Sequence, residues 1–145
     1  MSQADNPPKP IGKDLYAGGQ PDAEAIQQLA EQGFKSIVNL RSPDEAGALS
    51  DEQQQATAAG LEYVNVPLSP GEADDSLMAK VLWEVEKLPT PVFFHCGAGA
   101  RAGALALIAL ATQQGLNREQ VIAKAEEVGV NVEQPHLKSF LESLE

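Results

Sequence analysis

The chain has 145 residues, 43% of them hydrophobic, and this length fits a single domain that buries its own core. Its formal net charge of −11 at pH 7 repels polyanions over long range, which excludes general binding of nucleic acid or of an anionic membrane surface. The single cysteine excludes an internal disulfide, and the first ten residues lack a signal-peptide pattern, so we expect a cytoplasmic protein.

Strand and helix patterns alternate from the N-terminus onward. The polar, proline-containing residues 1–13 are expected to form a flexible arm, so the domain is predicted to span residues 14–145. Residues 14–21 are typical of a short strand that runs into a turn. Apolar residues then recur at helical spacing until Gly33, and residues 35–40 have the composition of a buried strand.

A helix start follows at residues 42–45, where Ser-Pro-Asp-Glu places proline at the first helical position and glutamate at the third. This pattern predicts a polar helix that ends near Gly60. Residues 61–68 are predicted to form a second strand, and residues 91–95 a third, more apolar one. An amphipathic helix lies between them, and its Trp83 is expected to join the core.

Residues 102–114 are apolar nearly all round, which predicts a buried central helix. Two further helices follow. One is capped by Asn117 with Gln120 reaching back, and the last carries His136, which we expect to face solvent or to cap the helix. Strands that alternate with helices imply crossover connections, hence a three-layer α/β fold with a mainly parallel sheet flanked by helices.

Ligands of such sheets bind beyond the carboxyl ends of the strands, where residues 39–45, 67–75 and 95–101 are expected to meet. The third of these loops, HCGAGAR, holds the only cysteine. Its small residues let backbone amides turn inward at the start of a helix, an arrangement that binds anions and favours a thiolate. The sequence thus predicts Cys96 as a nucleophile and Arg101 as a bidentate partner for an oxyanion.

A lone cysteine after an apolar strand can also be a small core side chain in a turn that serves packing alone. Two features favour a functional site: His95 directly precedes the thiol, and Arg101 begins an otherwise apolar helix. Arg41 and Gln20 lie at the ends of their own segments, where their side chains could line the opening of the site formed by the cysteine loop. Arg41 could equally pair with an acidic residue at 44–45.

The motif HCGAGAR after PVFF resembles the signature of the tyrosine and dual-specificity phosphatases, in which His-Cys is followed by five residues, Arg, and Ser or Thr. The segments LYAGGQP, GFKSIVNLR and YVNVPLSPG, together with the cysteine loop, are similar in order to a small bacterial phosphatase-like domain. That domain is also found fused to beta-lactamase-like hydrolases. The resemblance covers roughly residues 14–140 and implies a protein tyrosine phosphatase-like fold.

The resemblance also implies a cysteine-dependent phosphatase that needs no metal or other cofactor and hydrolyses a phosphorylated protein or a small-molecule phosphate ester. Cys96 would attack phosphorus, while loop amides and the Arg101 side chain hold the equatorial oxygens. His95 is expected to orient the loop through hydrogen bonds. The expected substrate-binding residues are His95, Gly97, Ala98, Gly99, Ala100 and Arg41.

Two departures from the phosphatase pattern leave other functions open. Only four residues separate Cys96 from Arg101, and a loop of this length is closer to the rhodanese-type sulfurtransferases, whose cysteine accepts sulfur from a sulfur donor. Ala102 stands where phosphatases place a hydroxyl, for which Ser69 could substitute. A module that binds an oxyanion without turnover is the third reading.

A phosphatase of this kind also needs a general acid for the leaving oxygen. The family takes it from an aspartate on the loop after the preceding strand, and that loop here offers Glu72, Asp74 and Asp75. Acidic residues at 74 and 75 are already explained by the start of the next helix. Glu72 is therefore the candidate acid.

Overall fold

A five-stranded sheet forms the middle layer of the protein. The computed structural model describes residues 8–48 and 50–144. The strands are β1 (Lys9–Pro10), β2 (Leu15–Gly18), β3 (Ser36–Asn39), β4 (Glu62–Asn65) and β5 (Val92–His95). They lie in the order β1-β2-β5-β3-β4, and every neighbouring pair is parallel except β1 with β2.

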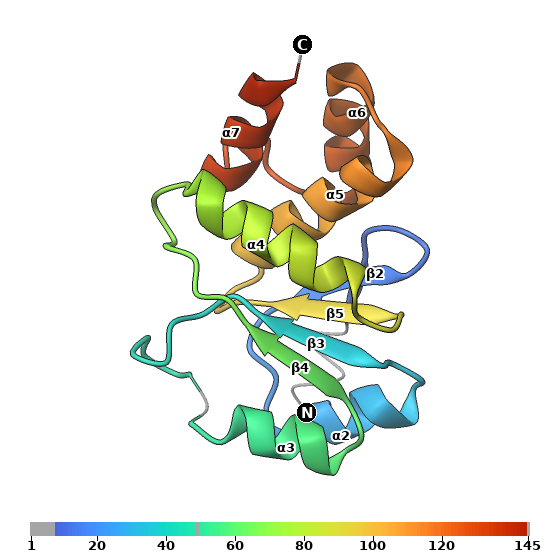
Figure 1. Cartoon of the computed structure of the whole chain (residues 1–145), viewed down its shortest axis with the longest axis vertical. Helices are drawn as coiled ribbons and strands as arrows, with labels where there is room; N and C mark the ends of the chain where they lie inside the picture. The colour runs from blue at the N-terminus through green and yellow to red at the C-terminus, as the bar shows by residue number, and fades with distance from the viewer. Residues whose placement is uncertain (1–7, 49, 145) are drawn as a thin grey trace.

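Helices cover both faces of this sheet. They are α2 (Ala23–Glu31), α3 (Glu52–Ala58), α4 (Asp75–Glu86), α5 (Ala100–Gln114), α6 (Arg118–Val128) and α7 (Pro135–Ser143). Figure 1 shows α2 and α3 on one side of the sheet and the other four helices on the opposite side. The predicted three-layer α/β fold with a mainly parallel sheet is confirmed.

The central position of β5 decides where the loops meet. All residues of β3 and β5 are buried, as expected for parallel strands covered on both faces. Successive side chains alternate between faces, so Phe93 packs on the α2 side and Phe94 joins the larger core around α5. Since β5 lies between β2 and β3, the loop that leaves its carboxyl end emerges between the loops that follow those two strands.

The helix α5 is the central helix of the larger core, as predicted. Its residues are buried from Arg101 through Ala111, because sheet and helices enclose it. No helix in the described part of the chain is long and apolar enough to cross a membrane.

The helix predicted from residue 43 begins only at Glu52. Residues 42–45 form a turn instead, in which the Glu45 N–H donates to the Ser42 carbonyl at 3.0 Å. Gly47 then has a φ of 89°, a left-handed conformation that ends any helical path. The helix-start pattern at residues 42–45 thus forms a single turn, and within the described residues no helix follows it directly.

The expected N-terminal arm is shorter than predicted. Lys9 and Pro10 pair with Ala17 and Tyr16 at the sheet edge, and Ile11 is only 1% exposed. Lys9 and Pro10 are exposed, whereas Ile11 packs into the larger core, so part of the segment predicted as an arm is ordered against the sheet. Residues 1–7 lie outside the described part.

The expectation that Trp83 joins the core is wrong. Its side chain is 61% exposed on the outer face of α4, where the Lys87 Nζ lies 3.4 Å from the ring centroid. The core side of α4 is instead formed by Met78, Val81 and Val85, whose helical spacing excludes position 83. Trp83 thus contributes little to the buried core.

Candidate active site

The loop between β5 and α5 encloses the sulfur of Cys96. The Cys96 Sγ accepts hydrogen bonds from the backbone N–H groups of Gly99 at 3.1 Å and Ala102 at 3.4 Å. Gly99 is the residue that caps α5, and its φ of 110° is a conformation that favours glycine. Cys96 is only 1% exposed, so the sulfur lies at the floor of the loop with two amide donors aimed at it.

Four further amides of this loop are available to a ligand. Within residues 8–48 and 50–144, the backbone N–H groups of Gly97, Ala98, Ala100 and Arg101 donate to no other group. Unpaired amides at a helix start attract an anion, because their dipoles add to the positive end of the helix. The loop thus presents unpaired donors next to the sulfur, an arrangement that can hold an oxyanion.

The end of β2 supports the loop from one side. The Gln20 N–H donates to the Gly97 carbonyl at 3.2 Å. A Cβ at Gly19 would lie 2.9 Å from the same carbonyl oxygen, closer than side chains approach. Glycine at position 19 is thus needed for the close contact between two backbone segments that are distant in the sequence.

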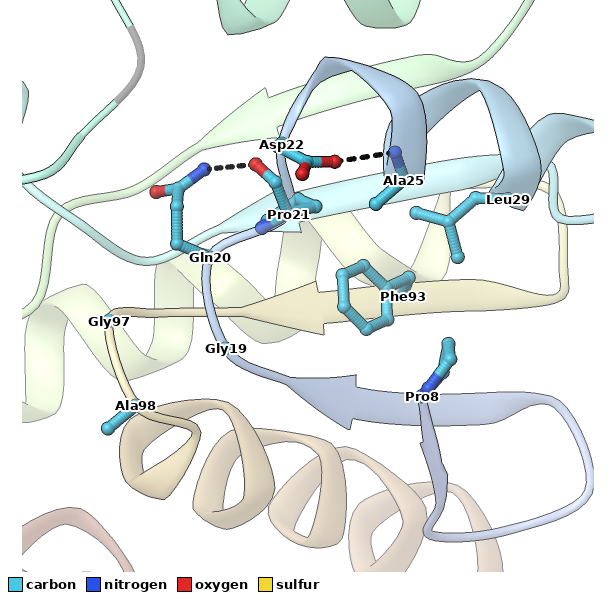
Figure 2. Close-up of a pocket in the computed structure, with 10 residues that line it drawn as sticks. All are labelled: Pro8, Gly19, Gln20, Pro21, Asp22, Ala25, Leu29, Phe93, Gly97 and Ala98. Atoms are coloured by element: carbon cyan, nitrogen blue, oxygen red, sulfur yellow. Dashed lines mark hydrogen bonds between the residues drawn. The ribbon is translucent and has the colours of Figure 1, made fainter. Parts of the chain in front are cut away.

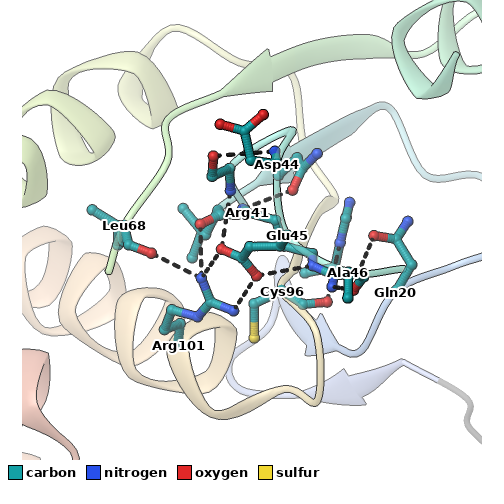
Figure 3. A network of polar contacts seen from close by, with 12 residues as sticks. Gln20, Arg41, Asp44, Glu45, Ala46, Leu68, Cys96 and Arg101 are labelled. Carbon is teal, nitrogen blue, oxygen red and sulfur yellow. Dashed lines mark hydrogen bonds and ion pairs between the residues drawn. The ribbon is translucent and has the colours of Figure 1, made fainter. Parts of the chain in front are cut away.

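The guanidinium of Arg101 binds the carboxylate of Glu45 through two hydrogen bonds (Figure 3). Its NH1 lies 2.8 Å from Oε2 and its NH2 2.9 Å from Oε1, and NH1 also donates to the carbonyls of Leu68 and Leu40. The bond to Glu45 raises the pKa of Arg101 against the effect of burial, and the neighbouring Cys96 adds to this rise.

Arg41 completes the charged cluster. Its Nε lies 3.1 Å from the Glu45 Oε1, its NH1 donates to the Gln20 Oε1 at 2.9 Å, and its NH2 donates to the Ala46 carbonyl. Its guanidinium also lies 3.7 Å from where a Cβ of Gly97 would stand. Arg41 therefore pairs with Glu45 and also lies next to Gly97 of the loop, while its contact with a substrate stays a prediction.

Glu45 is expected to stabilise the fold in a pH-dependent way. The hydrogen bond to Arg101 is the main cause that lowers its pKa from 4.5 to about 2. A depressed carboxyl pKa stabilises the folded state above its ordinary value, and this contribution is lost as the pH falls through the folded value. We expect Glu45→Gln to lower the free energy of unfolding near neutral pH by about 2 kcal/mol in urea titrations.

The difference between the two proteins should shrink as the pH falls from 4.5 toward 2. Asp44→Asn is the matched control, since Asp44 is an exposed neighbour whose carboxylate has no recorded ion pair in the described chain. An equal loss in both variants would show that the Arg101 pair does not matter.

His95 lies beneath the loop. Its ring is fully buried, with Nε2 on the Glu52 carboxylate and Nδ1 3.4 Å from the carbonyl oxygen of Cys96. Glu52 is itself 1% exposed and also accepts from the Gln20 Nε2 at 2.9 Å. The predicted orienting role fits this position, whereas direct contact with substrate does not, because no surface of the ring is accessible.

The loop after β4 carries the candidate acids. Asp74 caps α4 by accepting from the Leu77 N–H at 3.1 Å, and Asp75 begins that helix, as the capping interpretation predicted. Glu72 is exposed. The Ser69 hydroxyl accepts from the Gly71 N–H at 3.3 Å, within its own turn. In the described part, no group of three or more His, Cys, Asp or Glu side chains could hold a metal ion.

His136 is fully buried, which corrects the expectation of a solvent-facing residue. Its Nδ1 lies 2.9 Å from the Gln134 Nε2, and its Nε2 has no partner among the described residues. Burial lowers the pKa of His136, and the charge of Arg101 lowers it further. The residue that caps α7 is Gln134, whose Oε1 accepts from two backbone N–H groups.

Two cavities of about 350 Å³ flank the outer part of the loop at Ala98. One lies between the end of β2 and α2, with Phe93 at its base (Figure 2). The other lies between the loop and the α6–α7 connection, and includes Gly99 and Asn131. Both offer space next to the amides for groups attached to a bound oxyanion.

Sequence reasoning found the loop and considered a pair between Arg41 and residue 44 or 45, but it missed the pairs of Arg101 with Glu45 and of His95 with Glu52. Glu45 appeared as a helix-start residue, and its spacing to Arg41 was the only signal of an ion pair. Glu52 carried no signal, since nothing in a polar helix distinguishes one glutamate from another.

The comparisons with known proteins agree with this geometry. Residues 9–114 match the family described as beta-lactamase hydrolase-like protein, phosphatase-like domain. The chain belongs to this family. A beta-lactamase hydrolase-like protein from Agrobacterium fabrum is 30% identical over 115 residues, which cover 77% of this chain and 26% of that protein. This phosphatase-like domain thus spans about a quarter of the length of that relative.

Solved structures share the fold of the phosphatase-like domain. A candidate phosphatase from Shewanella putrefaciens CN-32 superposes with a TM-score of 0.74 at 23% identity and covers 93% of this chain and 88% of its own. Tk-PTP in its active form superposes with a TM-score of 0.75 at 21% identity, over 94% and 95% of the two chains. The predicted tyrosine phosphatase-like fold is confirmed.

Proposed function

We propose that the phosphatase-like domain is a cysteine-dependent phosphatase that hydrolyses a phosphomonoester through a phosphocysteine on Cys96. The observation that carries this proposal is the position of Sγ, 3.1 Å from the Gly99 N–H and within a loop that has four amides without a partner among the described residues. Such a loop presents a nucleophile and oxyanion donors to the same atom. Membership of a phosphatase-like family supports the reaction type.

The first step forms the S–P bond and breaks the bond between phosphorus and the leaving oxygen. The loop amides hold the equatorial oxygens, and the guanidinium of Arg101, which lies beside Cys96 in Figure 3, adds a cationic donor. Glu45 holds the other side of the guanidinium and thereby fixes its direction. Glu72, exposed in the loop after β4, is the proposed proton donor to the leaving oxygen.

In the second step a water oxygen attacks phosphorus and the S–P bond breaks, which releases inorganic phosphate and restores the thiolate. The substrate is a phosphorylated protein or a small-molecule phosphate ester. The cavities on either side of Ala98 have room for the alcohol portion of either.

A sulfurtransferase is the second candidate, favoured by two observations. The loop has four residues between Cys96 and Arg101, and Ala102 offers only its backbone N–H to the sulfur, at 3.4 Å. In this reaction the thiolate takes the outer sulfur of thiosulfate, sulfite leaves, and the persulfide passes that sulfur to cyanide as thiocyanate. A persulfide is smaller than a phosphoryl group and needs fewer oxyanion donors.

The covalent intermediate separates the two reactions. Because Cys96 is the only cysteine, mass spectrometry of the acid-quenched protein reads its state without ambiguity. After incubation with p-nitrophenyl phosphate we expect the peptide with Cys96 to gain a phosphoryl group, and Cys96→Ala to gain nothing. If Cys96 gains one sulfur atom with thiosulfate but no phosphoryl group with the phosphate ester, the protein is a sulfurtransferase and the phosphatase proposal is wrong. No adduct with either reagent would contradict both and leave an oxyanion-binding module.

A further inference from the structure

The protein has two histidines, and both are fully buried. Their ring nitrogens face different kinds of partner. A buried imidazole takes the protonation state that its partners can satisfy, because an unpaired donor or acceptor costs about 1–3 kcal/mol. The directions of the surrounding hydrogen bonds therefore assign a charge state to each ring.

The partners of His136 favour a neutral ring. The Gln134 Oε1 accepts from the backbone N–H groups of His136 and Leu137 at 2.8 and 3.0 Å, which fixes the orientation of that amide. The Gln134 Nε2 must then donate to the His136 Nδ1. The ring proton is left on Nε2, and the positive charge of Arg101 disfavours a second proton.

The partners of His95 are both acceptors. The carbonyl oxygen of Cys96 can only accept, so Nδ1 carries a proton. Nε2 faces the carboxylate of Glu52. Whether that nitrogen also holds a proton depends on whether Glu52 is ionised.

A chain of bonds that starts at Arg41 fixes which group donates to Glu52. Arg41 can only donate, so the Gln20 oxygen that it contacts at 2.9 Å is the acceptor. The Gln20 Nε2 then donates to the Glu52 Oε1 at 2.9 Å and to the Pro21 carbonyl. One Glu52 oxygen then accepts from Gln20 and the other faces Nε2 of His95. Because a carboxylic acid is ordinarily a stronger acid than an imidazolium, the proton between them is assigned to the ring, which gives a carboxylate paired with an imidazolium.

We propose that Glu52 is a positioning residue that keeps His95 doubly protonated, so that a fixed positive charge lies behind the nucleophile Cys96. This inference rests on the proposed function, because it gives Cys96 a reaction to perform. The carbonyl of Cys96 lies 3.4 Å from the charged ring, while Glu52 lies on the far side. The nearer charge has the larger effect on the sulfur and favours its thiolate.

Other charged and titratable groups face this pair from the neighbouring elements. Arg41 follows β3 and reaches Glu52 through Gln20, and Arg101 on α5 lies near the sulfur. Tyr63 on β4 has its pKa raised mainly by burial and also by the charge of Glu52, and its hydroxyl accepts from the Asn39 Nδ2 at 2.9 Å. The two arginines add to the effect of His95 on Cys96, whereas Glu52 is the only carboxylate within the described residues that bonds to the ring.

Nuclear magnetic resonance of ¹⁵N-histidine tests the charge states directly. Near neutral pH we expect one ring in the wild type, assigned to His95 by its loss in His95→Gln, to give imidazolium nitrogen shifts. The other ring, His136, should give the neutral form with the proton on Nε2. In Glu52→Gln the His95 signals should move to those of a neutral ring with the proton on Nδ1. A neutral His95 in the wild type near neutral pH overturns the proposal, even if Glu52→Gln fails to fold.

Alkylation of the single thiol by iodoacetamide reports the effect on Cys96. For Glu52→Gln we expect the pH at half-maximal alkylation rate to rise by about one unit, because one nearby charge shifts a titration by about 1–3 units. Glu126→Gln, on the exposed side of α6, removes the same charge elsewhere and should leave the profile unchanged. Equal profiles for all three proteins would overturn the role of Glu52. Neither measurement requires phosphate turnover. The charge of His95 can therefore be confirmed or contradicted whether or not the protein proves to be a phosphatase.

Discussion

Replacement of Cys96 by serine is expected to lower kcat/KM for p-nitrophenyl phosphate by at least about 1,000-fold, because a hydroxyl stays protonated where a thiolate attacks. The Sγ accepts from the Gly99 and Ala102 amides, and a serine oxygen can accept the same bonds, so the loop should keep its form. Phosphate release measured over a range of substrate concentrations gives the ratio. Thermal unfolding followed by circular dichroism establishes that the variant is folded.

Thr112→Ser is the control for this substitution. Its hydroxyl donates to the Ile108 carbonyl at 2.9 Å, far along α5 from the loop, so activity should be unchanged. Equal rates for wild type and Cys96→Ser, with both proteins folded, would show that the sulfur takes no part in the reaction. The covalent mechanism would then be wrong, whatever the family of the domain.

Arg101→Lys is expected to have the second largest effect, about 100-fold or more on kcat/KM. A lysine keeps the charge but loses the planar fork that binds the two oxygens of Glu45 next to Cys96. It can also no longer reach the Leu40 and Leu68 carbonyls while holding Glu45. We expect the free energy of unfolding to fall by about 1–3 kcal/mol, since buried acceptors lose their donor. Kinetics and urea titration measure the two effects.

Arg118→Lys is a matched control at the other end of the molecule. Its guanidinium donates to the Leu141 carbonyl at 2.6 Å and takes no part in the loop. This variant should lose some stability and no activity. If Arg101→Lys behaved in the same way, Arg101 would be a structural residue that holds Glu45 and the neighbouring carbonyls, and the oxyanion would depend on the amides alone.

Local signals in the sequence were enough to predict most of the elements. Alternation of apolar residues, and caps such as Asn117 with Gln120, depend on neighbours a few residues away. The mainly parallel sheet follows from the order of strands and helices. Cys96, Arg101 and the small residues between them lie close together in the chain, so the loop that holds them could be predicted as a candidate site before any tertiary contact was known.

Tertiary structure decided what surrounds that loop. Glu45 meets Arg101 across 56 positions, His95 meets Glu52 across 43, and Gln20 meets Glu52 across 32. These pairs exist because the sheet order brings the ends of β2, β3 and β5 together, and no local pattern contains that order.

The burial of single residues was also beyond local reasoning. His136 is enclosed and Trp83 is exposed, each against expectation, because the face that a helix buries depends on which helix packs against it. The conformation at Glu45 also depends on tertiary contacts. Its local sequence suits a helix start, yet the attraction of two arginines, one of them on α5, holds it in a turn. The sequence by itself determined most of the elements, their order and the cysteine loop, because these depend on neighbouring residues, and only the packed structure decided which distant charges surround that loop.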